Sequence, residues 1–249
     1  DLVRSRGLGD VYKRQIYELS PKKGITMINH VRHIIEIGKD TYINGKVDFK
    51  HIDEVCEIIY DFTKIMKEYQ VDDYIAYTTS SIREADNQDI ILDRIKVKTG
   101  IEVKILSNSE QRFLGYKALS VQSEFFSFIQ EGTAIVDVGA GSIQISLFDK
   151  DSLVTTQNIK LGSLRIRELL YRLSNDRQHF NRLIEELINN DIQTFKKLFL
   201  KDRSIKNIIA VGDYIGYFAK ENGKQLKFMN REELHFRSAD NICLLYTSP

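Results

Sequence analysis

The chain has 249 residues, of which 42% are apolar and 29% charged, so it can form one large or two smaller globular domains with a buried core. Its 36 Lys and Arg nearly balance 35 Asp and Glu, and a net charge of +1 argues against nucleic-acid and membrane-surface binders, which usually carry a basic excess. No apolar run is as long as a membrane span, and two cysteines cannot form a disulfide framework or a closed zinc site. We therefore expect a cytoplasmic protein.

The two ends of the sequence differ from the rest. Residues 1–15 carry several basic side chains with little amphipathic pattern, and residues 243–249 follow a polar stretch without structural continuity. We interpret both as non-native flanks read through from sequencing adapters, and we leave them out of the fold prediction. The rest is predicted to form a first lobe over 16–117 and a second lobe over 118–242, each incomplete at its outer end.

The first predicted elements are a hairpin and a long helix. Two extended runs within 16–37 flank a Pro-Lys-Lys-Gly turn at 21–24, which predicts a pair of antiparallel strands. Asp48 can cap a helix that runs to about Tyr69, because apolar residues recur there every three or four positions. Cys56 lies on that apolar face, so we expect it to pack in the core as a small hydrophobic residue.

Short strands and helices alternate in the following part of the chain. The pattern predicts strands over 73–77 and 101–106, a polar loop over 78–87, and helices over 88–98 and 109–120, with Gly100 ending the first of these helices. The second half is predicted to contain strands over 133–138, 143–148, 153–160 and 204–211, a mostly helical region over 164–200, and a helix after Asp213. Hairpins and crossovers in one chain indicate an α/β fold.

The glycine turn between the first two strands of the second half is the most informative segment. Gly139 and Gly141 let the backbone turn tightly, and the N–H groups of such a turn can hold phosphate oxygens together with the Ser142 hydroxyl. Asp137, at the end of a buried strand, can position Mg²⁺ or a metal-bound water. A plain glycine hairpin with an Asp turn cap explains this spacing equally well, since no helix follows as in a P-loop.

A second polar segment surrounds Arg83, which follows four consecutive hydroxyl residues at a strand end, where α/β sheets place ligands. Its guanidinium can bind phosphate through two N–H groups. The alternative is a solvated loop in which Arg83 pairs with Glu84 or Asp86.

A third polar segment lies at the predicted strand-to-helix junction over 106–112. Asn108 or Ser109 can cap the helix, and Glu110 then suits its first turn. Simple capping is sufficient to explain this segment. The five histidines show no metal-ligand spacing, so surface or packing roles are expected for them.

Taken in order, four segments resemble the exopolyphosphatase/guanosine pentaphosphatase (Ppx/GppA) phosphatase family over about residues 16–222. Residues 79–87 (TSSIREADN) resemble its TSAxREAxN pattern, and 99–112, 135–148 and 161–165 resemble TGIxVxxISGxEEA, xVDIGGGSTExxxF and LPLGAVRL. The resemblance implies an α/β fold of the actin-like ATPase superfamily, with two ribonuclease-H-like lobes of mixed sheets around a phosphate-binding cleft. The family's first phosphate loop would precede Ile16, so the first lobe is expected to be truncated at its N-terminus.

The resemblance also implies a site. Its members remove terminal phosphate with Mg²⁺ and a carboxylate that activates water. Carried over residue by residue, it assigns phosphate contacts to Arg83, Gly139, Gly141 and Ser142, metal contacts to Asp137 and Gln144, and the catalytic position to Gln111, with Glu110 beside it.

Two of these positions depart from the family pattern. Gln111 replaces the catalytic Glu, and Gln144 replaces an acidic metal-site residue. Gln cannot act as a general base, a role worth roughly 10²–10⁴ in rate, although it can orient a water by hydrogen bonding. Glu110 is a poor substitute, because consecutive helix residues point about 100° apart.

Two functions follow as expectations. The first is a phosphohydrolase that removes terminal phosphate from polyphosphate or guanosine pentaphosphate. The second is a catalytically weak or inactive module that senses polyphosphate or a guanosine alarmone. A kinase of the same superfamily would need an ATP site, for which residues 211–213 offer only one glycine. Neither nucleic acid nor a membrane is expected as a partner, and a homodimer is an option because two-lobed relatives often pair.

Overall fold

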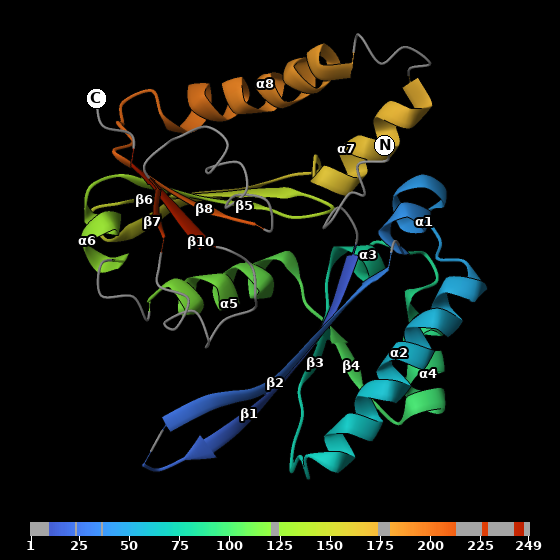
Figure 1. Ribbon diagram of the computed structural model, residues 1–249. Helices are drawn as coiled ribbons and strands as arrows, with labels where there is room; N and C mark the ends of the chain where they lie inside the picture. Colours follow the sequence, from blue (N-terminus) through green and yellow to red (C-terminus); the bar gives the residue numbers. More distant parts are fainter. Residues whose placement is uncertain are drawn as a thin grey trace. The chain divides into compact units, whose positions relative to one another are not determined.

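A computed structural model describes residues 10–22, 24–35, 37–120, 125–173, 180–212, 226–228 and 242–246 (Figure 1). The chain divides into two compact units, residues 1–114 and 115–249. Both contain helices and strands, and strands pair in parallel and antiparallel fashion, so the predicted α/β class with mixed sheets is confirmed. Among the described residues, no helix is long and apolar enough to cross a membrane.

The first unit opens with the predicted hairpin. Strands β1 (Asp10–Ser20) and β2 (Gly24–Ile35) pair antiparallel, and the turn ends at Gly24, whose φ of +69° is left-handed. Strand β1 begins inside the segment 1–15. The pairing of β1 with β2 does not test whether residues 1–15 are native, so their non-native origin stays a prediction.

Helix α2 (Phe49–Glu68) forms the core of the first unit, as its apolar spacing predicted. The Asp48 side chain caps it by accepting the Lys50 N–H at 2.9 Å. Val55 and Cys56 are buried in the core cluster, so the packing role expected for this cysteine is confirmed. Helix α4 (Gln88–Thr99) packs against α2 (Figure 1) and ends at Gly100, which has a left-handed φ of +74°.

A salt-bridge cluster joins these two helices. Asp53 on α2 accepts Arg94 Nε at 2.7 Å and Lys98 Nζ at 2.6 Å, both from α4. Hydrogen bonds from these two cations hold the pKa of Asp53 at about 2.

Two parallel strands lie beside the helices of the first unit. Strand β3 (Ala76–Thr78) pairs with β4 (Val103–Ile105). Strand β3 therefore lies slightly later than the predicted 73–77, and β4 is shorter than the predicted 101–106. Helix α1 (Ile37–Asn44) had no clear signal in the sequence.

The prediction of a polar loop over 78–87 is wrong in part, because residues Ser80–Arg83 form a short helix, α3. Ile82 and Ala85 are 1% and 3% exposed and belong to the core cluster. The high content of hydroxyl and charged residues concealed these two buried side chains. A segment anchored at two core positions cannot be a solvated loop.

The second unit is built on a six-stranded sheet in the order β7-β6-β5-β8-β10-β9. Its strands are β5 (Thr133–Val138), β6 (Ile143–Asp149), β7 (Ser152–Ile159), β8 (Asn207–Val211), β9 (Leu226–Phe228) and β10 (Ile242–Tyr246). The four strands predicted from the sequence are present, and β5 pairs parallel with β8 and antiparallel with β6. Strand β10 takes in part of the tail at 243–249, whose origin likewise stays a prediction.

Helices cover both faces of this sheet (Figure 1). Phe195 of α8 (Phe180–Phe199) packs with Ile145 and Leu147 on one face. Phe128 of α6 (Phe125–Gln130) packs with Ile135 on the other face, where α5 (Asn108–Ser120) contributes its last turns. Helix α7 (Ser163–Leu173) and α8 confirm the helical region predicted over 164–200. The helix expected after Asp213 lies outside the described residues.

Candidate functional site

The glycine turn joins β5 to β6 as an antiparallel hairpin. The Gly139 N–H donates to the Ser142 carbonyl at 3.0 Å, and Asp137 stands directly opposite Gln144 in the strand register. Directly opposite residues share one face of a sheet, so the two candidate metal contacts are neighbours on the same surface. The Ser142 residue is buried, with 7% exposed.

The start of helix α7 is tied to this turn. The Ser163 N–H donates to the Gly139 carbonyl at 3.0 Å, and the Leu164 and Arg165 N–H groups donate to the Ala140 carbonyl at 3.0 and 3.1 Å. Arg165 Nε donates to the Gly141 carbonyl at 2.8 Å. The first N–H groups of α7 are thus satisfied by the turn, which serves as the cap of the helix.

This docking directs the N–H groups of the turn. In a trans peptide unit the carbonyl and the following N–H point in opposite directions. Because the carbonyls of Gly139 and Ala140 face α7, the N–H groups of Ala140 and Gly141 point away from that helix. Successive N–H groups aimed to one side form a concave anion site. The prediction that this turn can hold phosphate oxygens therefore has a geometric basis.

The close approach between this turn and α7 depends on Gly162. This residue belongs to the family-like segment 161–165, and the sequence did not indicate its role. A Cβ added at Gly162 would lie 2.3 Å from the Ser142 nitrogen and 2.4 Å from the Ala140 oxygen. By contrast, a Cβ at Gly139 would come no closer than 3.4 Å, to the Ser142 oxygen. Gly162 is therefore the glycine that lets the turn and α7 pack backbone against backbone.

Gln144 has an unusual environment for a polar side chain. It is 3% exposed, and its Oε1 has no hydrogen-bond partner among the described residues. A buried acceptor without a donor is costly, which makes this oxygen available to a cation or a bound donor. It stands opposite Asp137, the one carboxylate among the candidate metal contacts.

Arg83 makes contacts that the sequence did not predict. Its guanidinium donates to the Leu106 carbonyl at 2.5 Å and to Asn108 Oδ1 at 2.6 Å. Both bonds lead to the strand-to-helix junction at 106–108, and pairing with Glu84 or Asp86 stays the alternative to phosphate binding. Burial lowers the pKa of Arg83, and the nearby Glu84 charge partly opposes this effect. Phosphate binding by Arg83 stays a prediction, and the observed bonds tie it to the start of α5.

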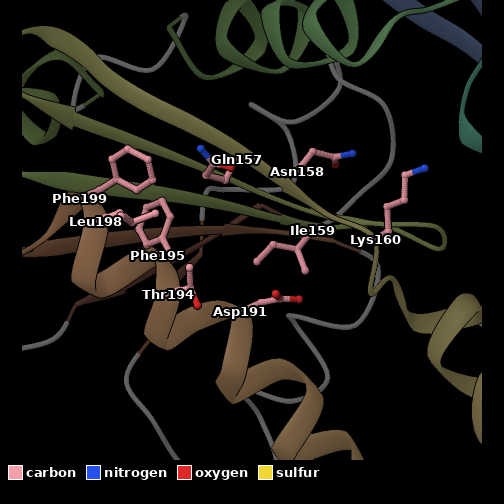
Figure 2. Close-up of a pocket in the computed structure, with 9 residues that line it drawn as sticks. All are labelled: Gln157, Asn158, Ile159, Lys160, Asp191, Thr194, Phe195, Leu198 and Phe199. Carbon is pink, nitrogen blue, oxygen red and sulfur yellow. The ribbon is translucent and has the colours of Figure 1, made fainter.

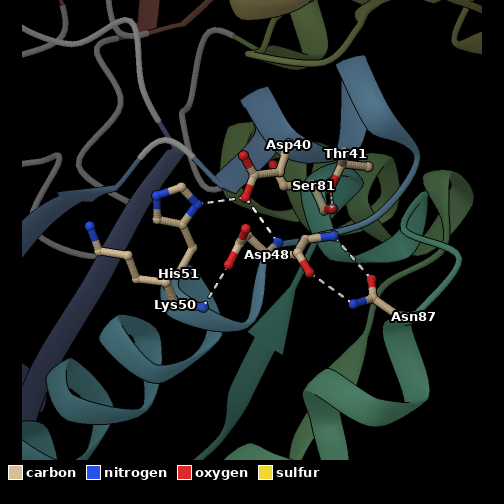
Figure 3. A network of polar contacts seen from close by, with 8 residues as sticks. Asp40, Thr41, Asp48, Lys50, His51, Ser81 and Asn87 are labelled. Carbon is tan, nitrogen blue, oxygen red and sulfur yellow. Dashed lines mark hydrogen bonds and ion pairs between the residues drawn. The ribbon is translucent and has the colours of Figure 1, made fainter.

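The segment that carries Arg83 is fixed to the preceding helix and turn (Figure 3). Thr41 Oγ1 donates to the Ser81 carbonyl at 2.6 Å. Asn87 bonds both backbone groups of Val47, at 3.1 Å to the N–H and 2.9 Å to the carbonyl. Asn87, a member of the REAxN pattern, therefore has a structural role here.

The cap of α5 is Ser107, not the predicted Asn108 or Ser109. Ser107 Oγ accepts the Glu110 N–H at 3.2 Å, and Glu110 Oε2 accepts the Ser107 N–H at 2.8 Å. This reciprocal pair is a capping box, and its Ser-x-x-Glu signature was present in the sequence. The hydrogen bonds with Ser107 lower the pKa of Glu110. A carboxylate used in this way is poorly suited to accept a proton.

Gln111 follows directly in the first turn of α5. Its N–H donates to the Ser107 carbonyl at 3.0 Å, while its side-chain Oε1 is buried without a partner in the described part of the chain. The predicted site residues thus fall into two sets. Arg83, Glu110 and Gln111 lie in residues 1–114, and Asp137, Gly139, Gly141, Ser142 and Gln144 lie in residues 115–249.

With this geometry established, comparison with known proteins identifies the family. The family model described as the Ppx/GppA phosphatase family matches residues 15–234. The chain belongs to the Ppx/GppA phosphatase family. This confirms the resemblance drawn from the four sequence segments.

Individual relatives are distant. The chain is 23% identical to a bifunctional 3-dehydroquinate synthase/phosphatase of Fusobacterium nucleatum over 55% of this chain and 21% of that protein. It is 23% identical to exopolyphosphatase 1 of Mycobacterium leprae over 57% of this chain and 41% of that protein. These matches cover less than half the length of either relative. A crystal structure of an exopolyphosphatase from Cytophaga hutchinsonii shares the fold, with a TM-score of 0.72, 15% identity, and coverage of 92% of this chain and 75% of that one.

Proposed function

We propose that this chain is part of a phosphohydrolase that removes terminal phosphate from polyphosphate or guanosine pentaphosphate by Mg²⁺-assisted attack of water. The observation that carries the proposal is the turn at 139–142, in which the carbonyls of Gly139 and Ala140 accept N–H groups of α7, so that the N–H groups of Ala140 and Gly141 point away from that helix. Membership of the Ppx/GppA family and the similarity to an exopolyphosphatase support the same chemistry.

Asp137 and Gln144 can contribute oxygen ligands to a hard cation such as Mg²⁺, but two such residues form a weak site. Among the described residues, no group of three or more His, Cys, Asp or Glu could hold a metal ion. Asp137 supplies one carboxylate, and the unpartnered Gln144 Oε1 beside it supplies a neutral oxygen. Oxygen ligands of this kind suit Mg²⁺, and an amide oxygen is a weaker ligand than the carboxylate it replaces. The ion, when bound, would neutralise charge on the phosphate oxygens.

The chain's own groups then have separate tasks. The N–H groups of Ala140 and Gly141 and the Ser142 hydroxyl bind phosphate oxygens, and Arg83 adds positive charge in the first unit. Gln111 hydrogen-bonds the attacking water and orients it, since its neutral amide cannot remove the proton. Glu110 keeps its capping role and does not touch the substrate. Cytoplasmic location, pairing as a homodimer and the absence of a nucleic-acid partner remain predictions.

A second function has a specific observation in its favour. Both positions at which the family pattern has a working carboxylate, 111 and 144, carry amides in this chain. The glycine turn at 139–142 is present, so under this alternative the chain binds an anionic phosphate chain without turning it over. Such a protein would act as a sensor of polyphosphate or of a guanosine alarmone.

The test measures phosphate release from polyphosphate and from guanosine pentaphosphate with Mg²⁺, in the unmodified chain and in Gln111→Glu. Binding of labelled polyphosphate is measured in parallel. Gln88→Glu, on helix α4, makes the same change of charge as a control. Release by the unmodified chain supports the phosphohydrolase.

The other outcomes separate the two functions. Binding without release, together with release by Gln111→Glu and not by Gln88→Glu, supports the sensor, because the site then lacks only its base. Absence of both polyphosphate binding and release in all three proteins contradicts both functions.

A further inference from the structure

Two oxygen atoms of the strand-to-helix junction hold the guanidinium of Arg83 in the first unit. Its Nη1 donates to the Leu106 carbonyl at 2.5 Å, and its Nη2 donates to Asn108 Oδ1 at 2.6 Å. Arg83 is half-buried, and its Nε is bonded to no described residue. Because a guanidinium has five N–H donors, this arrangement leaves donors for a ligand.

Both acceptors are fixed by the elements that carry them. The Leu106 N–H donates to the Thr78 carbonyl at 2.9 Å, which extends the pairing of β3 with β4. Asn108 is the first residue of α5 and lies inside the capping box formed by Ser107 and Glu110. A strand end and a helix start therefore present the two oxygens, and such elements position side chains more precisely than loops do.

Asn108 departs from the family pattern. In the segment 99–112 the pattern TGIxVxxISGxEEA has Gly where this chain has Asn108. A glycine has no side chain that could bond Arg83, so the contact with Asn108 Oδ1 depends on this substitution. An amide oxygen is also a neutral acceptor. It can hold the guanidinium without cancelling the positive charge that attracts a phosphate.

Holding an arginine in place lowers the cost of binding a ligand to it. A long side chain loses rotamer freedom when a ligand immobilises it, and contacts within the protein that hold it beforehand reduce this cost. We propose that Asn108 is a positioning residue for Arg83, which it holds, with its charge intact, for a phosphate group of the substrate. This inference rests on the phosphate contact of Arg83 in the proposed function.

The pocket shown in Figure 2 is a competing place for a phosphate chain. It has a volume of about 280 Å³ and lies between β7 and α8 in the second unit. Phe195 and Phe199 give it an apolar wall, and the Asp191 carboxylate also lines it. A carboxylate repels phosphate, so this pocket suits a phosphate chain poorly. Thr194 lines the pocket as well and is exposed, which makes it a suitable control position.

The experiment measures binding of fluorescently labelled polyphosphate to the full chain, together with the melting temperature of each variant. We expect Arg83→Ala to weaken binding about tenfold or more, and Asn108→Ala about three- to tenfold. In the Arg83→Ala background, Asn108→Ala should weaken binding no further, because it acts through the guanidinium. Asn108→Asp should weaken binding more than Asn108→Ala, because its carboxylate would pair with Arg83 and cancel its charge.

Two further variants serve as controls, and both should bind polyphosphate as the unmodified chain does. Ser109→Ala changes the next residue of the same helical turn, whose hydroxyl accepts Arg112 Nη2 at 3.2 Å. Thr194→Asp adds a carboxylate to the pocket between β7 and α8, as Asn108→Asp adds one beside Arg83. Arg83→Gln is the second uncharged background if Arg83→Ala does not fold.

Several results would overturn the inference. Binding that is lost in Arg83→Ala but unchanged in Asn108→Ala would do so and leave the proposed function standing. Equal weakening by Asn108→Ala with and without Arg83 would show a purely structural role. Loss of binding in Thr194→Asp at an unchanged melting temperature would place the phosphate chain in the pocket. No binding of polyphosphate by the unmodified chain would contradict both the inference and the proposed function.

Discussion

At the scale of single residues, Glu110 and Gln111 are neighbours with different roles. The Glu110 carboxylate and the Ser107 hydroxyl bond each other's backbone N–H groups, whereas the Gln111 side-chain oxygen has no partner in the described residues. A group already bonded to the backbone at a helix start stabilises that helix. A buried polar group without a hydrogen-bond partner is instead a candidate for contact with a substrate or an ion.

This contrast leads to a prediction for Glu110→Gln. Gln also completes a capping box, so the variant should keep both its melting temperature at pH 7 and any phosphate release that the chain or Gln111→Glu shows. Ser107→Ala, which removes the cap hydroxyl, should cost about 0.5–2 kcal/mol of stability in urea unfolding. Loss of phosphate release in Glu110→Gln with unchanged stability would mean that Glu110, and not only Gln111, acts on the substrate.

At the scale of elements, most boundaries followed from local patterns. The periodicity of α2, the Asp48 cap and the glycine after α4 each predicted an element that is present. Strands β5, β6 and β7 were also predicted within a residue or so at each end. The short helix α3 was missed because its composition is polar while its two apolar residues are buried in the core.

The packing of the β5–β6 turn against α7 leads to a prediction for the substitution Gly162→Ala. Gly162→Ala places a methyl group 2.3 Å from the Ser142 nitrogen, so the turn or the helix must shift. We expect a loss of about 1–3 kcal/mol in urea unfolding and weaker polyphosphate binding. Gly115→Ala is the matched control, since its Cβ would meet nothing within 4 Å and helix propensity should favour it by about 0.5–1 kcal/mol. Equal stability of Gly162→Ala and the unmodified chain would contradict the tight packing.

At the scale of the whole molecule, the described residues form three core clusters, one in the first unit and two in the second. One surrounds α2 in residues 1–114, and the others cover the two faces of the sheet in residues 115–249. Ile52 is 0% exposed in the first unit, and Leu147 is 1% exposed in the second. Each of these side chains contributes to the stability of its own unit.

Substitutions at these two positions test whether the units open independently. Ile52→Ala and Leu147→Ala should each cost about 2–5 kcal/mol in the unit that contains them. Native-state hydrogen exchange should then accelerate in α2 and α4 for Ile52→Ala, and in β5 and β6 for Leu147→Ala. Equal acceleration in both units for either variant would mean that the chain unfolds as one cooperative block.

The sequence by itself determined the α/β class, most elements, the glycine turn and the family, because periodicity, caps and motifs are properties of neighbouring residues. Only the tertiary structure showed that Arg83 bonds Leu106 and Asn108, that Gly162 lies against Ser142, and that Asn158 faces Gln144. These contacts join residues between 14 and 25 positions apart. They depend on strand register and on how closely two backbones approach, and no local pattern encodes either.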